Sequence, residues 1–291
     1  MSTWTPGPAW LFCPADRPDR YGKALAAADV VIVDLEDAVA LAAKAEAREA
    51  LRGLVADGTL DPERTVVRVN SVQVDGADSP EHALDVALVA ELGLPRVMLA
   101  KTETAADVGT VAATTGAEVV ALIETPRGVR DVDAIAEAPN LVGLMWGAED
   151  LAAGLGGTSS RGADGSYREV ARYARSRSLV AAKASGRLAL DSVYLDIPDT
   201  DGLAAESADA AASGFDAKVA IHPAQVAPIR SAFLPDAEQV AWAEALLAHV
   251  GDDRSVTTFH GRMVDGPVYL QAERVLRLAG ASPTAPGEDP S

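Results

Sequence analysis

The run 30–35 reads Val-Val-Ile-Val-Asp-Leu, and two acids, Glu36 and Asp37, follow it directly. A nearly continuous apolar run is typical of a strand buried on both faces, as in a parallel sheet covered by helices. Seven further runs of this kind occur along the chain. The eight predicted strands are residues 9–14, 30–35, 65–70, 96–100, 118–123, 141–146, 188–195 and 217–221.

Stretches rich in Ala, Leu, Lys, Glu and Arg, which are good helix formers, separate these runs. Eight β-α units over about 230 residues predict an α/β fold, a closed (β/α)8 TIM barrel. A doubly wound open sheet is the alternative, although no glycine fingerprint follows the first strand. The predicted helices are 20–28, 38–56, one that begins at Ser79-Pro80, 105–114, 129–138, 166–185, 202–213 and 223–232.

The chain beyond the last β-α unit has a different pattern. Helices are predicted for 236–250 and for a segment that ends at residue 279, and the final residues are rich in Pro and Gly. We therefore expect a barrel catalytic domain at 1–234, a C-terminal helical extension and lid at 235–280, and a disordered tail at 281–291.

Composition excludes several classes of protein. The 291 residues carry 25 basic and 43 acidic side chains, a net charge of −18, which disfavours nucleic-acid and membrane partners. A single cysteine, Cys13, rules out an internal disulfide, and only 4 histidines leave no zinc pattern. No apolar run approaches the roughly 20 residues of a membrane span, and the start lacks a signal-peptide pattern. We expect a soluble cytoplasmic protein.

Charged side chains follow most of the predicted strands. Active sites of (β/α)8 enzymes lie at the carboxyl ends of the strands, so these side chains are candidate site residues. Loop starts are often polar, which is the alternative explanation for any single residue. The strand-end residues are Asp16, Arg17, Glu36, Asp37, Arg68, Lys101, Glu124, Glu149, Asp150 and His222.

Glu124 and Asp150 are the strongest candidate pair of site residues, because they follow consecutive strands and their carboxylates can converge. Two oxygen ligands without a nearby Cys or His pair favour Mg²⁺ over Zn²⁺. Both residues also precede predicted helices, so two helix N-cap carboxylates are the alternative. The sequence predicts a magnesium site at Glu124 and Asp150.

Three basic residues complete the predicted site. Arg68 ends an apolar run and needs either a fixed carboxylate, with Asp37 as the expected mate, or a substrate carboxylate. Lys101 is expected to act electrostatically, since a metal makes a Schiff base redundant. Arg17 lies near other basic residues in an acidic chain, which indicates a phosphate-binding mouth or, equally, a solvated basic face.

Five segments in order resemble the citrate lyase beta-subunit-like group of the HpcH/HpaI aldolase family, which includes malyl-CoA and citramalyl-CoA lyases. The resemblance runs from about residue 10 to residue 280. The segments are 10–18 (Trp-Leu-Phe-Cys-Pro-Ala-Asp-Arg-Pro), 33–39 (Val-Asp-Leu-Glu-Asp-Ala-Val), 147–151 (Gly-Ala-Glu-Asp-Leu), 220–223 (Ala-Ile-His-Pro) and 261–265 (Gly-Arg-Met-Val-Asp).

The resemblance implies a barrel enzyme, a homotrimer or a hexamer, that uses Mg²⁺ to make or cleave a carbon–carbon bond between an acyl-CoA and a 2-oxo acid. Glu124 and Asp150 match the metal ligands, and Arg68 matches the arginine that binds the substrate carboxylate. Other matches are Asp37 as a rim acid, Asp265 as an acid from a neighbouring subunit's lid, and Arg17 and Lys101 as residues near substrate and CoA.

Malyl-CoA and citramalyl-CoA are the expected types of substrate, with glyoxylate, pyruvate or oxaloacetate as the oxo acid. The same site predicts thioesterase or malate-synthase-like side activity. Two other functions remain open at this point. One is the beta subunit of a citrate lyase complex that acts on a citryl thioester of an acyl carrier, and the other is a non-catalytic binding or assembly subunit.

Overall fold

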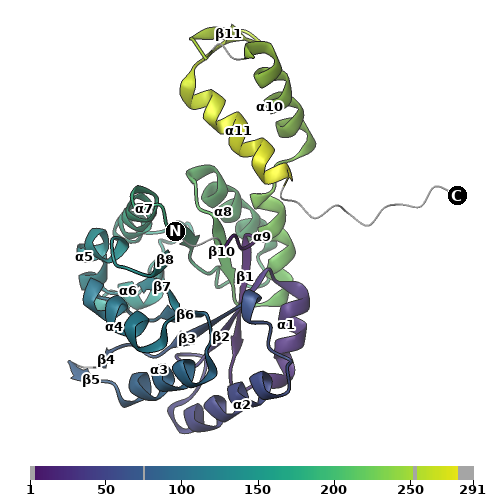
Figure 1. Cartoon of the computed structure of the whole chain (residues 1–291). Helices are drawn as coiled ribbons and strands as arrows, with labels where there is room; N and C mark the ends of the chain where they lie inside the picture. The colour runs from purple at the N-terminus through teal and green to yellow at the C-terminus, as the bar shows by residue number, and fades with distance from the viewer. Residues whose placement is uncertain (1–3, 75, 252–253, 281–291) are drawn as a thin grey trace, which may run out of the picture. The chain divides into compact units, whose positions relative to one another are not determined.

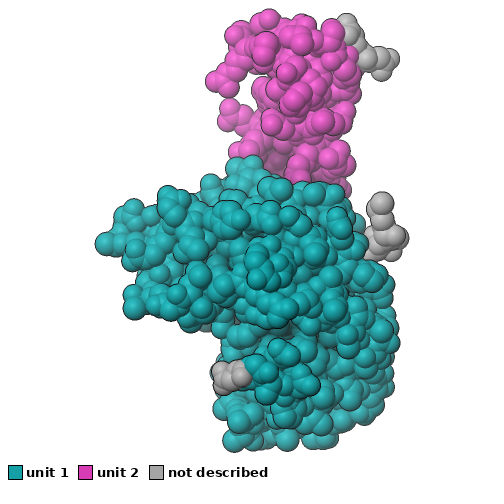
Figure 2. Space-filling view, turned by 90° about the vertical axis from the view of Figure 1, so that its left-hand side faces the viewer, with its two compact units in different colours: residues 1–229 teal, residues 230–291 magenta. Residues whose placement is uncertain are grey.

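The computed structural model describes residues 4–74, 76–251 and 254–280. The chain divides into two compact units, Met1–Ile229 and Arg230–Ser291 (Figure 2). The predicted boundary between residues 234 and 235 lies just after helix α9 (Val226–Phe233), whereas the structural division falls inside this helix. The predicted disordered tail, 281–291, lies outside the described residues.

The first unit is a closed barrel of eight parallel strands (Figure 1). Their order around the barrel is β1-β10-β9-β8-β7-β6-β3-β2, which confirms the (β/α)8 TIM barrel and excludes the open sheet. The strands are β1 (Ala9–Pro14), β2 (Val30–Asp34), β3 (Thr65–Val69), β6 (Arg96–Leu99), β7 (Glu118–Ile123), β8 (Leu141–Trp146), β9 (Leu188–Asp191) and β10 (Ala217–Ala220).

Helices follow the strands and cover the outside of the barrel (Figure 1). α3 begins with Pro80 after the N-cap Ser79, and α4 ends at Gly116 in the left-handed conformation, as local chemistry predicts. The helices of this unit are α1 (Tyr21–Ala27), α2 (Lys44–Ala56), α3 (Pro80–Leu92), α4 (Ala105–Thr115), α5 (Pro126–Ala136), α6 (Ala148–Gly154), α7 (Glu169–Ala184), α8 (Thr200–Ser213) and α9.

Helix α2 starts six residues later than the sequence predicts. The carboxylate of Asp34 accepts hydrogen bonds from the backbone N–H groups of Glu36 (2.9 Å) and Ala38 (3.1 Å). These bonds hold the chain in a loop after β2, so the helix cannot begin at residue 38. A short 3-10 helix, Leu41–Ala43, then leads into α2.

The inside of the barrel is filled with large apolar side chains from its strands, as expected for the core of this fold. They include Trp10, Ile32, Met98, Leu122, Met145 and Leu190. None of the helices in the described ranges is both long enough and apolar enough to span a bilayer.

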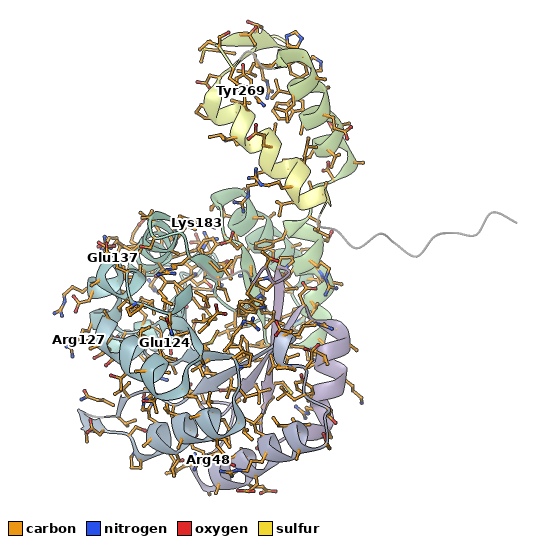
Figure 3. All side chains as sticks on the ribbon, viewed as in Figure 1. Arg48, Glu124, Arg127, Glu137, Lys183 and Tyr269 are labelled. Carbon is orange, nitrogen blue, oxygen red and sulfur yellow. The ribbon has the colours of Figure 1, made fainter. Side chains whose placement is uncertain are left out.

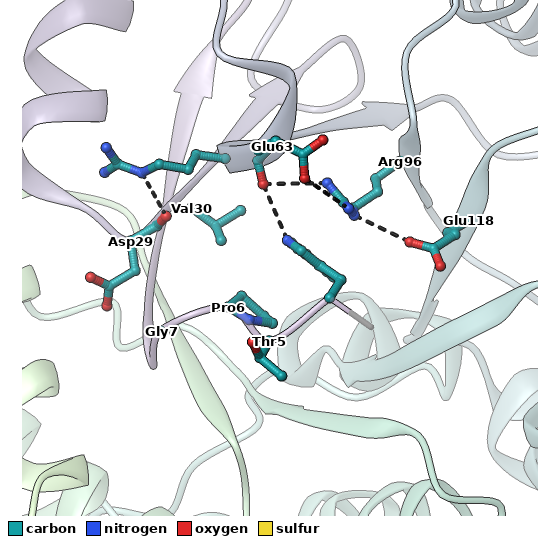
Figure 4. A pocket seen from close by; sticks show the side chains of 10 residues that line it. Thr5, Pro6, Gly7, Asp29, Val30, Glu63, Arg96 and Glu118 are labelled. Atoms are coloured by element: carbon teal, nitrogen blue, oxygen red, sulfur yellow. Dashed lines mark hydrogen bonds and ion pairs between the residues drawn. The ribbon is translucent and has the colours of Figure 1, made fainter. Parts of the chain in front are cut away.

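A polar pocket of about 840 Å³ lies where several strands begin, and its groups pair with one another (Figure 4). Arg96 contacts the carboxylates of Glu63 (3.4 Å) and Glu118 (3.2 Å), and its guanidinium lies 4.2 Å from the ring centre of Trp4. The amino-terminal face of a barrel serves stability, so this pocket is not the candidate active site.

The second unit is a helical hairpin with a small β-hairpin between its helices (Figure 1). Its elements are α10 (Ala237–Val250), β11 (Thr257–Phe259), β12 (Arg262–Val264) and α11 (Gly266–Gly280). The turn residues His260 (φ 47°) and Gly261 (φ 75°) are both left-handed, the conformation that a two-residue hairpin turn requires.

Candidate active site

A cavity of about 320 Å³ lies at the carboxyl ends of the barrel strands. This is the end at which barrel enzymes place their chemistry. Glu124, which follows β7, is labelled in Figure 3. The charged lining residues are Asp34, Arg68, Glu124, Glu149 and Asp150, and the apolar ones include Phe12, Leu122, Met145, Val193 and Ile221.

Arg68 is held by two carboxylates. Its Nε and Nη2 donate to the two oxygens of Asp34 at 2.7 and 2.6 Å, and its Nη1 lies 3.2 Å from Glu36. The prediction that Asp37 is the ion-pair partner of Arg68 is therefore wrong. Asp34 and Arg68 stand opposite each other in the register of β2 and β3, so the partner comes from inside the neighbouring strand.

Burial lowers the pKa of Arg68, but the charge and hydrogen bonds of Asp34 outweigh this effect and raise it. Arg68 is therefore a fixed cation among the residues that line the cavity.

Lys101 connects the acidic residues of the site. Its backbone N–H donates to Oε1 of Glu124 at 3.0 Å. Its ammonium contacts Glu36 and lies 3.2 Å from Asp37 and 3.3 Å from Asp150. Lys101 has φ 50°, a left-handed conformation that is unusual for a residue with a side chain. This conformation lets its backbone and its side chain contact acids of the same site.

Glu124 is 4% exposed. Burial raises the pKa of its carboxyl group to about 8, and the charge of Asp150 contributes, while Lys101 and Arg68 act in the opposite direction. A Cβ atom at Gly147 would lie 2.6 Å from Oε2 of Glu124. Only glycine at this position leaves room for the Glu124 carboxylate.

Glu124 and Asp150 have the donor chemistry of a magnesium site. Both provide oxygen ligands, both contact Lys101, and their mutual repulsion contributes to the high pKa of Glu124. No group of three His, Cys, Asp or Glu side chains in the described ranges could enclose a metal ion. Mg²⁺ is commonly held by one or two carboxylates and keeps waters or substrate oxygens as its other ligands, so these two residues fit it.

Four predicted site residues, Arg17, Asp37, Lys101 and Asp265, are not among the residues that line this cavity. Arg17 follows β1, forms a 3.3 Å ion pair with Asp19, and is not among the residues that line the cavity. Asp37 has a side chain that is 59% exposed. Asp265 belongs to the second unit, where its carbonyl accepts hydrogen bonds from the first turn of α11.

Sequence reasoning missed the roles of Asp34 and Gly147. Asp34 is 1% exposed and is the last residue of β2. An acid within an apolar run is itself a signal, because a buried charge requires a partner. The role of Gly147 has no such signal, since it depends on a contact between neighbouring strands.

A closed parallel barrel, with two acids and a fixed arginine in a cavity at its carboxyl end and a lysine that contacts both acids, defines a (β/α)8-barrel enzyme. The sequence pattern of one family matches residues 9–223. The chain belongs to the HpcH/HpaI aldolase/citrate lyase family. The predicted family and the predicted enzyme class, a carbon–carbon lyase, are therefore confirmed.

Known relatives match nearly the whole chain. It is 52% identical to the citrate lyase subunit beta-like protein of Mycobacterium tuberculosis, over 96% of this chain and 98% of that protein. It is 31% identical to human mitochondrial citramalyl-CoA lyase, over 95% of this chain and 86% of that protein. A crystal structure of M. tuberculosis CitE with magnesium, acetoacetate and coenzyme A has a TM-score of 0.87 and 53% identity, covering 94% and 98% of the two chains.

Proposed function

We propose that this chain is a Mg²⁺-dependent lyase that reversibly cleaves 3-hydroxyacyl-CoA esters, such as malyl-CoA or citramalyl-CoA, into an acyl-CoA and a 2-oxo acid. The observation that carries the proposal is that Glu124 and Asp150 both contact Lys101 and that both line a cavity with Arg68. The related CitE structure with magnesium, acetoacetate and coenzyme A supports it.

Glu124 and Asp150 hold the metal ion in this proposal. When bound, Mg²⁺ supplies Lewis-acid chemistry at the oxygens of the oxo acid. Arg68, fixed by Asp34, presents its remaining N–H groups to the same oxygens and stabilises the negative charge that develops there. Lys101 bridges Glu36 and Asp150 through its ammonium group and adds positive charge to the site.

Asp265 acts as the general acid–base in this proposal, delivered from the lid of a neighbouring subunit in a homotrimer or hexamer. Cleavage breaks the bond between C2 and C3 of the acyl chain. The C3 hydroxyl loses its proton to water as its oxygen becomes the carbonyl oxygen of the oxo acid, and the electron pair of the broken bond remains on C2 of the thioester. Asp265 then donates a proton to this carbon, and it removes the same proton in the direction of synthesis.

A panel of 3-hydroxyacyl-CoA esters tests the function. We expect the purified chain to release an oxo acid and an acyl-CoA from malyl-CoA or citramalyl-CoA, and excess EDTA to abolish this release. Oxo acid and free thiol are measured separately, because thiol release without oxo acid identifies thioesterase activity. Activity only on a citryl thioester of an acyl carrier protein, or full activity in EDTA, would contradict the proposal.

Magnesium affinity should depend on pH through Glu124. Its carboxyl group must lose a proton to bind the ion, and its pKa without metal is raised to about 8. We expect affinity to increase by about tenfold per pH unit below pH 8 and to level off above it. Calorimetry in buffers of different ionisation enthalpy should show the release of most of one proton at pH 7. An affinity that is constant from pH 6 to 9 would count against this role.

A further inference from the structure

The helix that carries Asp150 has no capping side chain. α6 is seven residues long, and its N-cap is Gly147, so no side chain of the cap can bond the first turn. The glycine is required because a Cβ atom there would collide with Glu124. The glycine that leaves room for Glu124 therefore leaves the helix that carries Asp150 without a capping side chain.

A residue outside the helix bonds a side chain of this first turn. The hydroxyl of Ser160 donates a 2.6 Å hydrogen bond to Oε1 of Glu149, the residue before Asp150. Ser160 is 3% exposed, whereas Glu149 is exposed, so the hydrogen bond between them is partly buried. The side chain of Glu149 is thereby anchored on one side of α6.

The loop that carries Ser160 is itself fixed to the barrel. Arg161 donates to Glu206 of α8 at 2.7 Å and to the carbonyl of Gly165 at 2.9 Å. Glu206 also accepts a 2.9 Å bond from Lys218, which is completely buried in β10. The loop that positions Ser160 is thus held by a partly buried ion-pair network that ends on the buried Lys218.

A second contact joins the same loop to the end of β8. Tyr167 packs edge-on against Trp146, with ring centres 5.0 Å apart. Trp146 is fully buried, and its Nε1 donates to Asp191 at 2.7 Å. The loop therefore contacts the chain on both sides of Gly147.

We propose that Ser160 is a positioning residue for the metal-binding carboxylate Asp150, acting through Glu149, with the Arg161–Glu206 ion pair holding its loop in place. The assignment of Asp150 as a metal ligand rests on the proposed function. The positioning of the first turn of α6 does not, and it can be measured without metal or substrate.

Amide hydrogen exchange of residues 147–154 in the metal-free protein tests the positioning directly. In Ser160→Ala we expect this segment to exchange about twofold to tenfold faster, because one partly buried hydrogen bond is lost. Thr158→Ala is the matched control, since it removes an exposed hydroxyl two residues away that makes no hydrogen bond in the described part of the chain. Unchanged exchange in Ser160→Ala, or equal acceleration in Thr158→Ala, would overturn the proposal.

A double-mutant cycle assigns the effect to this one contact. Glu149→Ala should accelerate exchange as Ser160→Ala does, and the double variant should be no faster than either single one. Thermal melting confirms that each variant is folded. Fully additive effects would show that the bond between Ser160 and Glu149 is not the cause.

Magnesium titration then connects the positioning to the metal. We expect Ser160→Ala to bind Mg²⁺ about tenfold more weakly in calorimetry, while Thr158→Ala binds as the wild type does. If the wild type binds no Mg²⁺, the proposed function fails while the exchange result still decides the positioning. If the wild type binds Mg²⁺ and Ser160→Ala binds it equally well, the role of Ser160 toward Asp150 is refuted.

Discussion

Glu124→Gln is expected to abolish detectable magnesium binding and to lower the rate of CoA-ester cleavage by about a thousandfold or more. Glutamine has nearly the same shape as glutamate and keeps an oxygen for the backbone N–H of Lys101. It lacks the negative charge that a divalent ion requires. Calorimetry measures magnesium binding, and the oxo-acid assay at saturating substrate measures the rate of cleavage.

The same substitution has a second expected result, which separates charge from folding. The pKa of Glu124 is raised from 4.5 to about 8 in the folded chain. Ionisation of this group therefore lowers the stability of the folded protein as pH rises from 4.5 to 8. In EDTA above pH 8, Glu124→Gln should therefore melt at a higher temperature than the wild type. Glu137→Gln, at an exposed position of the same unit (Figure 3), is the control and should change neither binding nor melting. Retention of magnesium binding in Glu124→Gln would refute the proposed metal site.

Asp265→Asn is expected to lower kcat by about a hundredfold to ten-thousandfold and to leave magnesium affinity unchanged. Asparagine cannot exchange a proton with the acyl carbon, whereas the acids of the barrel remain intact. A split between a large loss in kcat and an unaltered metal affinity distinguishes a proton-transfer role from a ligand role. An equal loss of metal affinity would contradict it.

Mixed oligomers test where Asp265 acts. Co-expression of Asp265→Asn with Glu124→Gln should restore activity, although each variant alone is inactive. In a mixed oligomer, an intact barrel from one chain can meet an intact lid from the other. If the lid serves the barrel of its own chain, every site contains one defect and co-expression yields no recovery.

The barrel could be predicted because its signals are local. Runs such as 30–35 and 118–123 are apolar without alternation, and their ends are marked by charged residues such as Glu124. Once the strands are parallel, their carboxyl ends must meet, so the gathering of Arg68, Lys101 and Glu124 follows from the fold class. The late start of α2 did not follow, because it depends on hydrogen bonds from Asp34 to the loop.

The pattern of residues along the chain was sufficient for the class of fold, the family, and the charged residues that line the cavity other than Asp34, since each of these depends on residue type and spacing. Which side chains pair with one another depended on three-dimensional contacts. Asp34 replaces Asp37 as the partner of Arg68 because the register of two strands sets them side by side. Gly147 and Ser160 acquire their roles because folding brings them against Glu124 and Glu149, and a contact between distant segments leaves no periodic trace in the sequence.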